Sequence, residues 1–384
     1  MSLFLNSLFA SVALGHLMVD VFNSSRPVLL TYLGLSETEI ALVSTIYIWA
    51  SALSQPFFGW LSDRIGPRWL AAGGVLWMSI FYSLAVFLPG DAGLVCLIVA
   101  ALGSAAFHPV GTVQATLQGR EKLKGREATA TSLFFMAGQI GHFIGPVITG
   151  LILAKMGAPG LVSLSVISIP IGLAVARQLS ANHPHPETVT ASKSSAMRWS
   201  VWAILVLAVV ATLQSWAQSN MVNFVPKYIK DLGQSAATYG NMAGLFMGGS
   251  ALGNFIGGIL GDRHIKKYVV AIALTLASVP IFLMSKIGWS GWLYVLIPLA
   301  GLFTGAVHSI MVVMAQRLLP GGMALASGVT LGFIFSAGAL GMLLTGPMAE
   351  TQGFPSVLVL SSGLVLVGAV FALALPEETI FTTH

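Results

Sequence analysis

Long hydrophobic stretches, interrupted by short polar or glycine-containing breaks, follow one another along almost the whole chain. A helix that crosses a membrane needs about 20 consecutive apolar residues, whereas a barrel strand alternates over about 10. These stretches are too long for strands, so the pattern predicts membrane-spanning helices. The predicted spans are residues 3–32, 38–61, 69–88, 92–117, 127–154, 158–179, 200–226, 235–260, 267–286, 291–316, 323–349 and 354–375.

The composition supports this interpretation and excludes a water-soluble fold. Only 8% of the 384 residues are charged and 56% are hydrophobic, whereas soluble domains carry about 25% charged residues. Twelve spans leave no room for a large soluble domain. We therefore predict an all-α, multi-pass protein of the cell membrane, of the bacterial inner-membrane type, that works as a monomer without a cofactor. The single cysteine, Cys96, cannot form an internal disulfide.

The basic residues are unevenly distributed between the breaks. With the N-terminus placed in the cytoplasm, 13 Lys and Arg residues fall on the cytoplasmic side and 5 on the opposite side. Cytoplasmic loops of membrane proteins carry the excess of Lys and Arg. The net charge of +5 is therefore read as a topology signal that places both termini in the cytoplasm, and nucleic acid is not expected as a partner.

The two halves of the chain repeat each other. Residues 181–199 are the longest polar stretch and are predicted to link an N-terminal half, 1–180, to a C-terminal half, 200–384. Matching residues lie 199–201 positions apart; they are Gly59–Arg64 and Gly258–Arg263, Pro27 and Pro226, His108 and His308, and Gly145-Pro146 and Gly346-Pro347. Six predicted spans separate the equivalents, which indicates two pseudo-symmetric six-helix halves in parallel orientation.

The connection after the second span carries the pattern Gly59-x3-Asp63-Arg64-x-Gly66-x-Arg68. This pattern resembles the signature loop of the major facilitator superfamily. The resemblance implies that these residues, with Asp262 and Arg263 in the second half, act in the conformational switch. Glycine permits a tight turn, and Asp63 can pair with Arg64, Arg68 or a helix N-terminus.

Three further motifs resemble the fosmidomycin-resistance branch of this superfamily. They are His16-x3-Asp20, Phe107-His108-Pro109, and Gly138-Gln139-Ile-Gly141 followed by Gly145-Pro146. The last of these also resembles the fifth-span motif of proton-coupled drug antiporters. The resemblance implies export of a small molecule such as an anionic phosphonate. We assign Gly141, Gly145 and Pro146 to conformational switching, although close helix packing alone also explains small residues.

Asp20 is the only acidic residue placed deep inside a predicted span. A charge at the centre of a membrane costs at least about 2.5–3.5 kcal/mol, so an acid there is a candidate functional site. His16 and Asn23 are four and three residues away, and therefore share one helix face with Asp20. We expect Asp20 and His16 to couple transport to protons. The alternative is a structural Asp hydrogen-bonded to His16.

Other polar residues inside the spans are candidates for substrate binding. Arg26 could bind an anion, or it could extend to lipid headgroups. The remaining candidates are Asn23, His108, His142, Gln139, Gln214, Gln218 and His308, for which simple packing roles are the alternative. Ser215 and Ser219 stand where the second half would repeat His16 and Asp20, so proton chemistry is expected in the first half only.

These observations predict a proton-coupled exporter that works by alternating access, with a small anionic or zwitterionic molecule, protons and the lipid bilayer as its partners. A divalent-metal carrier that uses His16, Asp20 and further histidines is the alternative, although no HxxxH cluster or cysteine pair supports it. The chain is not expected to be an enzyme, since it lacks the HExxH and GxSxG patterns. A receptor that does not transport would bind a ligand without moving it.

Overall fold

The computed structural model describes residues 6–122, 127–179, 201–318 and 323–376. The predicted linker, 181–199, lies outside these residues. All regular elements of the described residues are helices. They are α1 (Ser7–Tyr32), α2 (Glu37–Ile65), α3 (Pro67–Phe87), α4 (Gly90–Lys122), α5 (Glu127–Met156), a 3-10 turn (Ala158–Leu161), α6 (Val162–Gln178), α7 (Val201–Asp231), α8 (Ala236–Arg263), α9 (Lys266–Met284), α10 (Leu293–Gly305), α11 (His308–Leu318), α12 (Met323–Gln352) and α13 (Phe354–Ala372).

Twelve segments of the described chain are long and apolar enough to cross a membrane. Their positions follow the predicted spans, which confirms the all-α membrane fold. The predicted span 291–316 is found as one membrane-crossing segment, Leu293–Gln316, and within it the chain makes a turn at 306–307 between α10 and α11. The backbone N–H of Ser309 donates instead to the Asn254 side chain, at 3.0 Å. A side-chain partner of this kind satisfies the N–H groups at a helix start, so α11 begins anew.

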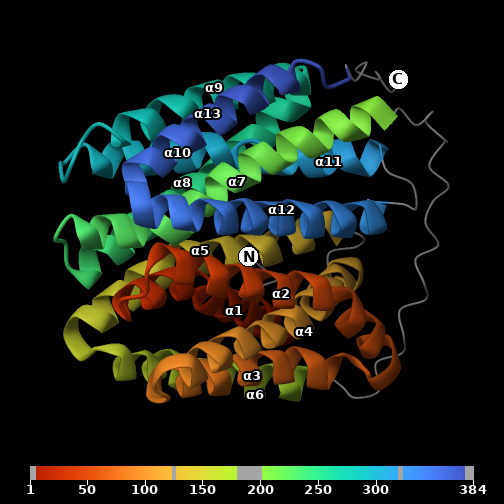
Figure 1. The fold of residues 1–384 in the computed structure, drawn as a ribbon. Coiled ribbons are helices and arrows are strands. Elements are labelled where there is room, and N and C mark those ends of the chain that lie inside the picture. Colours follow the sequence, from red (N-terminus) through yellow and green to blue (C-terminus); the bar gives the residue numbers. More distant parts are fainter. Residues whose placement is uncertain (1–5, 123–126, 180–200, 319–322, 377–384) are drawn as a thin grey trace, which may run out of the picture. The chain divides into compact units, whose positions relative to one another are not determined.

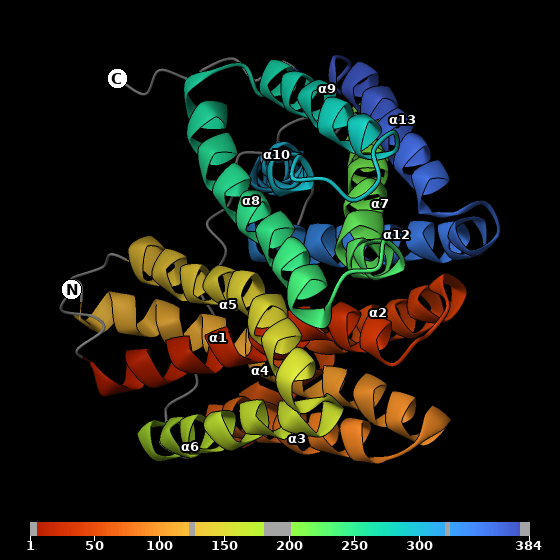
Figure 2. The same ribbon diagram turned by 90° about the vertical axis from the view of Figure 1, so that its left-hand side faces the viewer.

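The helices form two compact units that repeat one pattern of contacts. One unit holds α1 and α3–α6, the other holds α7 and α9–α13, and α2 and α8 contribute residues to both. In the first unit α1 packs on α5 and α6, and α3 packs on α4 and α6. In the second unit α7 packs on α12 and α13, and α9 packs on α10 and α13 (Figures 1 and 2). The two units thus share one pattern of helix contacts, with α10 and α11 together in the place of α4.

The turn between α2 and α3 explains the glycine of the signature pattern. Gly66 has φ +87°, a left-handed conformation that other residues rarely adopt, and Pro67 follows as the first residue of α3. Asp63 and Arg64 are exposed in the last turn of α2. The guanidinium groups of Arg64 and Arg68 lie over the rings of neighbouring tryptophans, at 4.2 and 4.8 Å. Among the described residues no ion pair joins Asp63 to either arginine, which were two of its three possible partners.

Candidate functional site

Helix α1 places an acid in the interior of the first unit. Most of its residues are buried, which is possible because several helices of that unit surround it. Asp20 is only 4% exposed and His16, one turn earlier, is 3% exposed. Their side chains lie on one face of the helix, as the spacing of four residues predicts. A buried carboxyl group needs partners, and the partners of Asp20 define the site.

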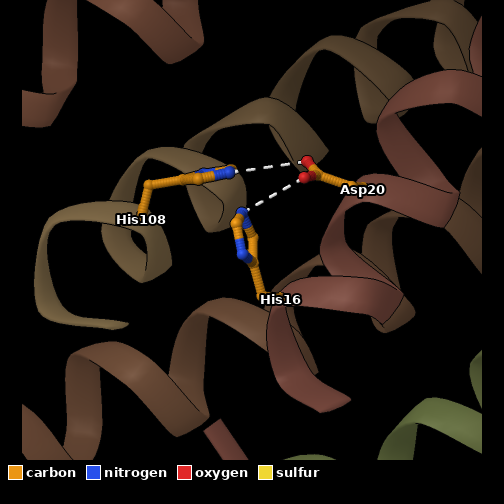
Figure 3. A group of neighbouring side chains, drawn as sticks. All are labelled: His16, Asp20 and His108. Atoms are coloured by element: carbon orange, nitrogen blue, oxygen red, sulfur yellow. Dashed lines mark ion pairs between the residues drawn. The ribbon is translucent and has the colours of Figure 1, made fainter. Parts of the chain in front are cut away.

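Three imidazoles from three helices converge on the Asp20 carboxylate. His16 Nε2 of α1 lies 3.2 Å from Oδ2, and His142 Nε2 of α5 lies 3.5 Å from the same oxygen. His108 Nε2 of α4 lies 3.4 Å from Oδ1. Figure 3 shows the side chains of His16 and His108 pointing toward the carboxylate from different helices. We call Asp20 and these three histidines the acid–imidazole cluster.

Backbone carbonyls fix the orientation of two of these rings. His16 Nδ1 lies 2.8 Å from the carbonyl oxygen of Phe134, and His108 Nδ1 lies 2.8 Å from that of Ser104. A carbonyl oxygen can only accept a hydrogen bond, so Nδ1 of each ring carries the hydrogen. In a neutral ring Nε2 is then a bare lone pair that faces Asp20. The contacts of His16 Nε2 and His108 Nε2 with the carboxylate oxygens are then favourable only when a proton or another cation lies between nitrogen and oxygen.

Aromatic rings hold His16 in place. The ring stacks on Phe134 of α5 with centroids 4.0 Å apart and planes inclined by 16°, and Phe107 of α4 lies at 6.2 Å. Both phenylalanines are fully buried. A close-packed wall of this kind leaves a side chain little freedom to move. Both residues of the Phe107-His108 motif thus contribute to the site. Phe107 packs beside the His16 ring, and His108 contacts the Asp20 carboxylate.

A chain of hydrogen bonds extends from the cluster along α1. Asn23 Nδ2 donates to Asp20 Oδ1 at 3.0 Å and also to Ser104 Oγ at 3.0 Å. The Tyr47 hydroxyl of α2 donates to Asn23 Oδ1 at 2.7 Å. The Arg26 guanidinium lies over the Tyr47 ring, 4.4 Å from its centroid. We call the side chains of Asn23 and Tyr47 the amide–phenol bridge, because they connect the carboxylate to the guanidinium.

Arg26 is 5% exposed and therefore does not extend to the protein surface, as a side chain directed at lipid headgroups would. Tyr47 and Ser104 were missed by the sequence argument. Ser104 could have been predicted from the sequence, since it precedes His108 by one helical turn. Tyr47 could not, because only the tertiary structure brings its hydroxyl group to Asn23.

Glycines of α5 bring that helix onto α1 at the site. A side chain at Gly141 would collide with the carbonyl oxygen of Leu17, and one at Gly145 with Ser24. A Cβ atom at Gly138 would lie 2.5 Å from Asp20 Oδ2 and 2.7 Å from His16 Nε2. Small residues that permit such approaches are typical of membrane helix pairs. The motif is thus responsible for the position of His142, which belongs to the same helix.

Replacing Gly138 by alanine is expected to disturb the acid–imidazole cluster. The added methyl group needs space that the carboxylate and the stacked His16 ring occupy, and overpacking of this kind costs typically about 1–3 kcal/mol. We expect a lower midpoint of thermal unfolding and weaker transport. Gly73→Ala is the control, since Gly73 lies within α3 and a Cβ atom there has no neighbour within 4 Å. Equal melting temperatures for the two variants would contradict the prediction.

The candidates of the second unit do not gather around a charge. Gln214 donates to Gln218 at 2.5 Å and to the carbonyl oxygen of Thr304 at 3.0 Å, and Gln218 donates to Ser250 at 3.2 Å. His308 starts α11, with its ring centroid 6.1 Å from that of Phe335. These are neutral polar groups already engaged within the unit.

The remaining predicted residues lie apart from the cluster. Gln139 is half-buried on α5, beside Gly138, and Pro146 is buried within the same helix. Asp262 and Arg263 are exposed at the end of α8 and occupy the position in the repeat that Asp63 and Arg64 hold at the end of α2. The signature pattern therefore repeats in the second unit at an equivalent helix end, as well as in the sequence.

Twelve membrane-spanning helices in two repeated units, with a buried charged site, define the class of multi-pass membrane transporters. The profile of the Major Facilitator Superfamily matches residues 8–217 and 207–381. The chain belongs to this superfamily, and it is accordingly a membrane transporter and not an enzyme.

Similar sequences are known in several bacteria. The fosmidomycin resistance protein of Escherichia coli is 26% identical over 97% of this chain and 93% of its own length. An uncharacterized MFS-type transporter of Bacillus subtilis, YfnC, is 28% identical over 96% of this chain and 92% of its own length. Proteins named for multidrug resistance match shorter parts of the chain, such as a Mycobacterium tuberculosis homologue that is 26% identical over 42% of it.

Solved structures with the same fold are more distant in sequence. A bacterial homologue of the human lysosomal transporter Spinster, in an inward-facing and occupied conformation, superposes with a TM-score of 0.80 at 14% identity, and the match covers 97% of this chain and 96% of the other. A D-xylose–proton symporter superposes with a TM-score of 0.74 at 12% identity, covering 97% and 98%. At these identities the likeness shows the fold alone.

Proposed function

We propose that this transporter exports a small anionic or zwitterionic molecule in exchange for protons, by alternating access of its two halves. The observation that carries the proposal is the buried Asp20 carboxylate with three imidazoles within 3.5 Å. Ionisable groups inside membrane helices are costly, and they characteristically belong to proton relays or substrate pathways. The similarity to proteins named for fosmidomycin and multidrug resistance supports export of a drug-like molecule.

The ring orientations support a role in proton binding. His16 and His108 each use Nδ1–H for a backbone carbonyl and turn Nε2 toward Asp20. Each of these two contacts becomes a hydrogen bond only when a proton lies between nitrogen and oxygen. The cluster thus offers two positions, each between a ring nitrogen and a carboxylate oxygen, at which a proton could be held. Loss of those protons leaves lone pairs facing a carboxylate, which favours rearrangement of α1 against α4.

The amide–phenol bridge supports coupling between protons and substrate. Arg26 is a buried cation that offers a planar donor set to a phosphonate or carboxylate. Its guanidinium lies on Tyr47, whose hydroxyl is connected through Asn23 to Asp20. A substrate anion that draws Arg26 away also moves the Tyr47 ring beneath the guanidinium. This movement loosens the hydrogen bond from Asn23 to Asp20. Gln139, Gln214, Gln218 and His308 remain proposed neutral contacts of the substrate.

The proposal is tested with purified protein in lipid vesicles that contain a pH-sensitive dye. Fosmidomycin-like phosphonates, sugars, lipophilic cations and metal ions are added in turn. Protons should cross the membrane only when the added compound belongs to a class that the protein transports. Proton movement that depends on a phosphonate supports the proposal. Substrate movement that is independent of any pH gradient would overturn proton coupling.

A carrier for divalent metal ions is the second candidate function. It is favoured by one observation, that ligand atoms of His16, Asp20 and His108 lie within 4.8 Å of one another. Under this alternative the metal ion is the transported substrate and accumulates inside the vesicles. Under the first function the metal ion does not accumulate.

Tyr47→Phe is expected to weaken coupling more than binding. The change removes the hydrogen bond to Asn23, worth about 0.5–1.5 kcal/mol, and keeps the ring beneath Arg26. The number of protons moved per substrate molecule should fall in vesicles, while the Kd of the substrate stays nearly unchanged. Tyr294→Phe is the control, since Tyr294 is 43% exposed on α10. An unchanged ratio of protons to substrate in Tyr47→Phe would show that the bridge has no role in coupling.

A further inference from the structure

We propose that the acid–imidazole cluster is also a binding site for a four-coordinate transition-metal ion such as Zn²⁺, with His16, Asp20 and His108 as its ligands. This inference concerns regulation of the site to which the proposed function assigns proton binding. It does not require that the metal is transported. A bound ion would join α1 to α4 through three side chains and arrest the carrier.

The distances between the ligand atoms suit such an ion. Zn²⁺ binds imidazole nitrogen at about 2.0–2.1 Å and carboxylate oxygen at about 2.0–2.2 Å, usually in a tetrahedron. Two ligands of that tetrahedron are then about 3.4 Å apart. His16 Nε2 lies 3.2 Å from Asp20 Oδ2, and His108 Nε2 lies 3.4 Å from Oδ1. All three residues offer a ligand atom within 4.8 Å of the others. Binding therefore requires ligand atoms that are up to 4.8 Å apart to close to about 3.4 Å.

The hydrogen bonds of the two histidines resemble those of histidines that bind metals. Histidines that bind metals almost always donate their other ring N–H to a carbonyl or a carboxylate, which fixes the ring and its tautomer. His16 donates from Nδ1 to the Phe134 carbonyl and His108 to the Ser104 carbonyl, both at 2.8 Å. Both Nε2 lone pairs are thereby turned toward the carboxylate. Asn23 Nδ2 holds Asp20 Oδ1 from the other side.

A further imidazole lies beside the ligand atoms. His142 Nε2 is 3.5 Å from Asp20 Oδ2, whereas the ligand atoms that all lie within 4.8 Å of one another belong to His16, Asp20 and His108. The fourth position of the ion is left to water, as in zinc sites with three protein ligands. Imidazole nitrogen with a carboxylate suits Zn²⁺, Co²⁺ and Ni²⁺ and does not suit Mg²⁺ or Ca²⁺, which prefer oxygen ligands.

The experiment measures metal binding by the purified, chelator-treated protein, which carries an affinity tag without histidine. Co²⁺ is the spectroscopic probe, because four-coordinate Co²⁺ absorbs visible light more strongly than the hydrated ion. Zn²⁺ binding is followed by calorimetry and by displacement of Co²⁺. We expect one saturable site per chain, a visible Co²⁺ spectrum of four-coordinate type, and no competition by Mg²⁺.

Three variants locate the site. His108→Gln and Asp20→Asn should weaken Zn²⁺ and Co²⁺ binding by about 10-fold or more and abolish the visible spectrum. His308→Gln is the matched control, a half-buried histidine of the second unit, and should bind as the parent does. Gel filtration and thermal unfolding check that each variant is folded. Absence of saturable binding to the parent, or equal loss in folded His308→Gln, overturns the inference.

Metal inhibition of transport separates this inference from the proposed function. Zn²⁺ outside the vesicles should inhibit substrate transport by the parent protein. Whatever transport His108→Gln retains should not be inhibited. Metal binding without any proton-driven transport would refute the proposed function and leave the metal site standing. Proton-driven transport by a protein that does not bind Zn²⁺ would refute the metal site alone.

Discussion

Asp20→Asn is expected to reduce transport driven by a pH gradient to the level of vesicles without protein. The amide has nearly the shape of the carboxyl group and still accepts a hydrogen bond from Asn23, so the fold should survive. It cannot carry a negative charge or take up a proton, however, so the three imidazoles no longer face a group that exchanges protons. Uptake of radiolabelled substrate into vesicles with an imposed pH gradient measures the effect.

The matched control is Asp91→Asn, which removes an exposed acid in the first turn of α4 and should leave transport intact. Exchange of substrate between equal concentrations on both sides needs no net proton movement, and Asp20→Asn should retain part of it. Full pH-driven transport by purified Asp20→Asn would show that Asp20 is a structural residue and would remove the basis of the proposed proton coupling.

Arg26→Gln is expected to weaken binding of an anionic substrate by roughly ten- to hundredfold, since a hydrogen bond to a charged group contributes about 1.5–3 kcal/mol. Arg26→Lys keeps the charge and loses the planar fork that binds two oxygens at once, so its Kd should lie between those of the parent and Arg26→Gln. The Kd values of a phosphonate and a lipophilic cation, measured by calorimetry on the same preparations, give the comparison.

Arg177→Gln supplies the control for charge alone, because Arg177 is an exposed arginine in the last turn of α6. It should bind the phosphonate as the parent does. An equal loss of phosphonate and cation binding in Arg26→Gln would mean that Arg26 supports the structure through Tyr47. Transport of the cation by the parent, with no transport of the anion, would refute an anionic substrate.

Part of the candidate site follows from one helix and is therefore visible in the sequence. His16, Asp20 and Asn23 are spaced by three or four residues, and helical geometry alone puts them on one face. In the structure Asn23 Nδ2 donates to Asp20 Oδ1, and His16 Nε2 lies 3.2 Å from Asp20 Oδ2. The assembly of the whole cluster was not visible, since His108 and His142 come from α4 and α5. In the sequence those histidines are therefore separate candidates for substrate binding, with packing as the alternative, and no HxxxH cluster joins them.

The sequence by itself determined the number of spans and the all-helical class through its hydrophobic pattern, and the repeat of two six-helix halves through residues that recur 199–201 positions apart. Membrane helices satisfy their backbone hydrogen bonds within one segment, so length and apolarity are enough to predict them. The break at 306–307 was not determined in this way, because it depends on the side chain of Asn254 from another helix. Only the tertiary structure decided which polar groups meet at Asp20. Glycines of α5 permit a close approach to α1, and the resulting distances between side chains of different helices leave no trace in the spacing of residues along the chain.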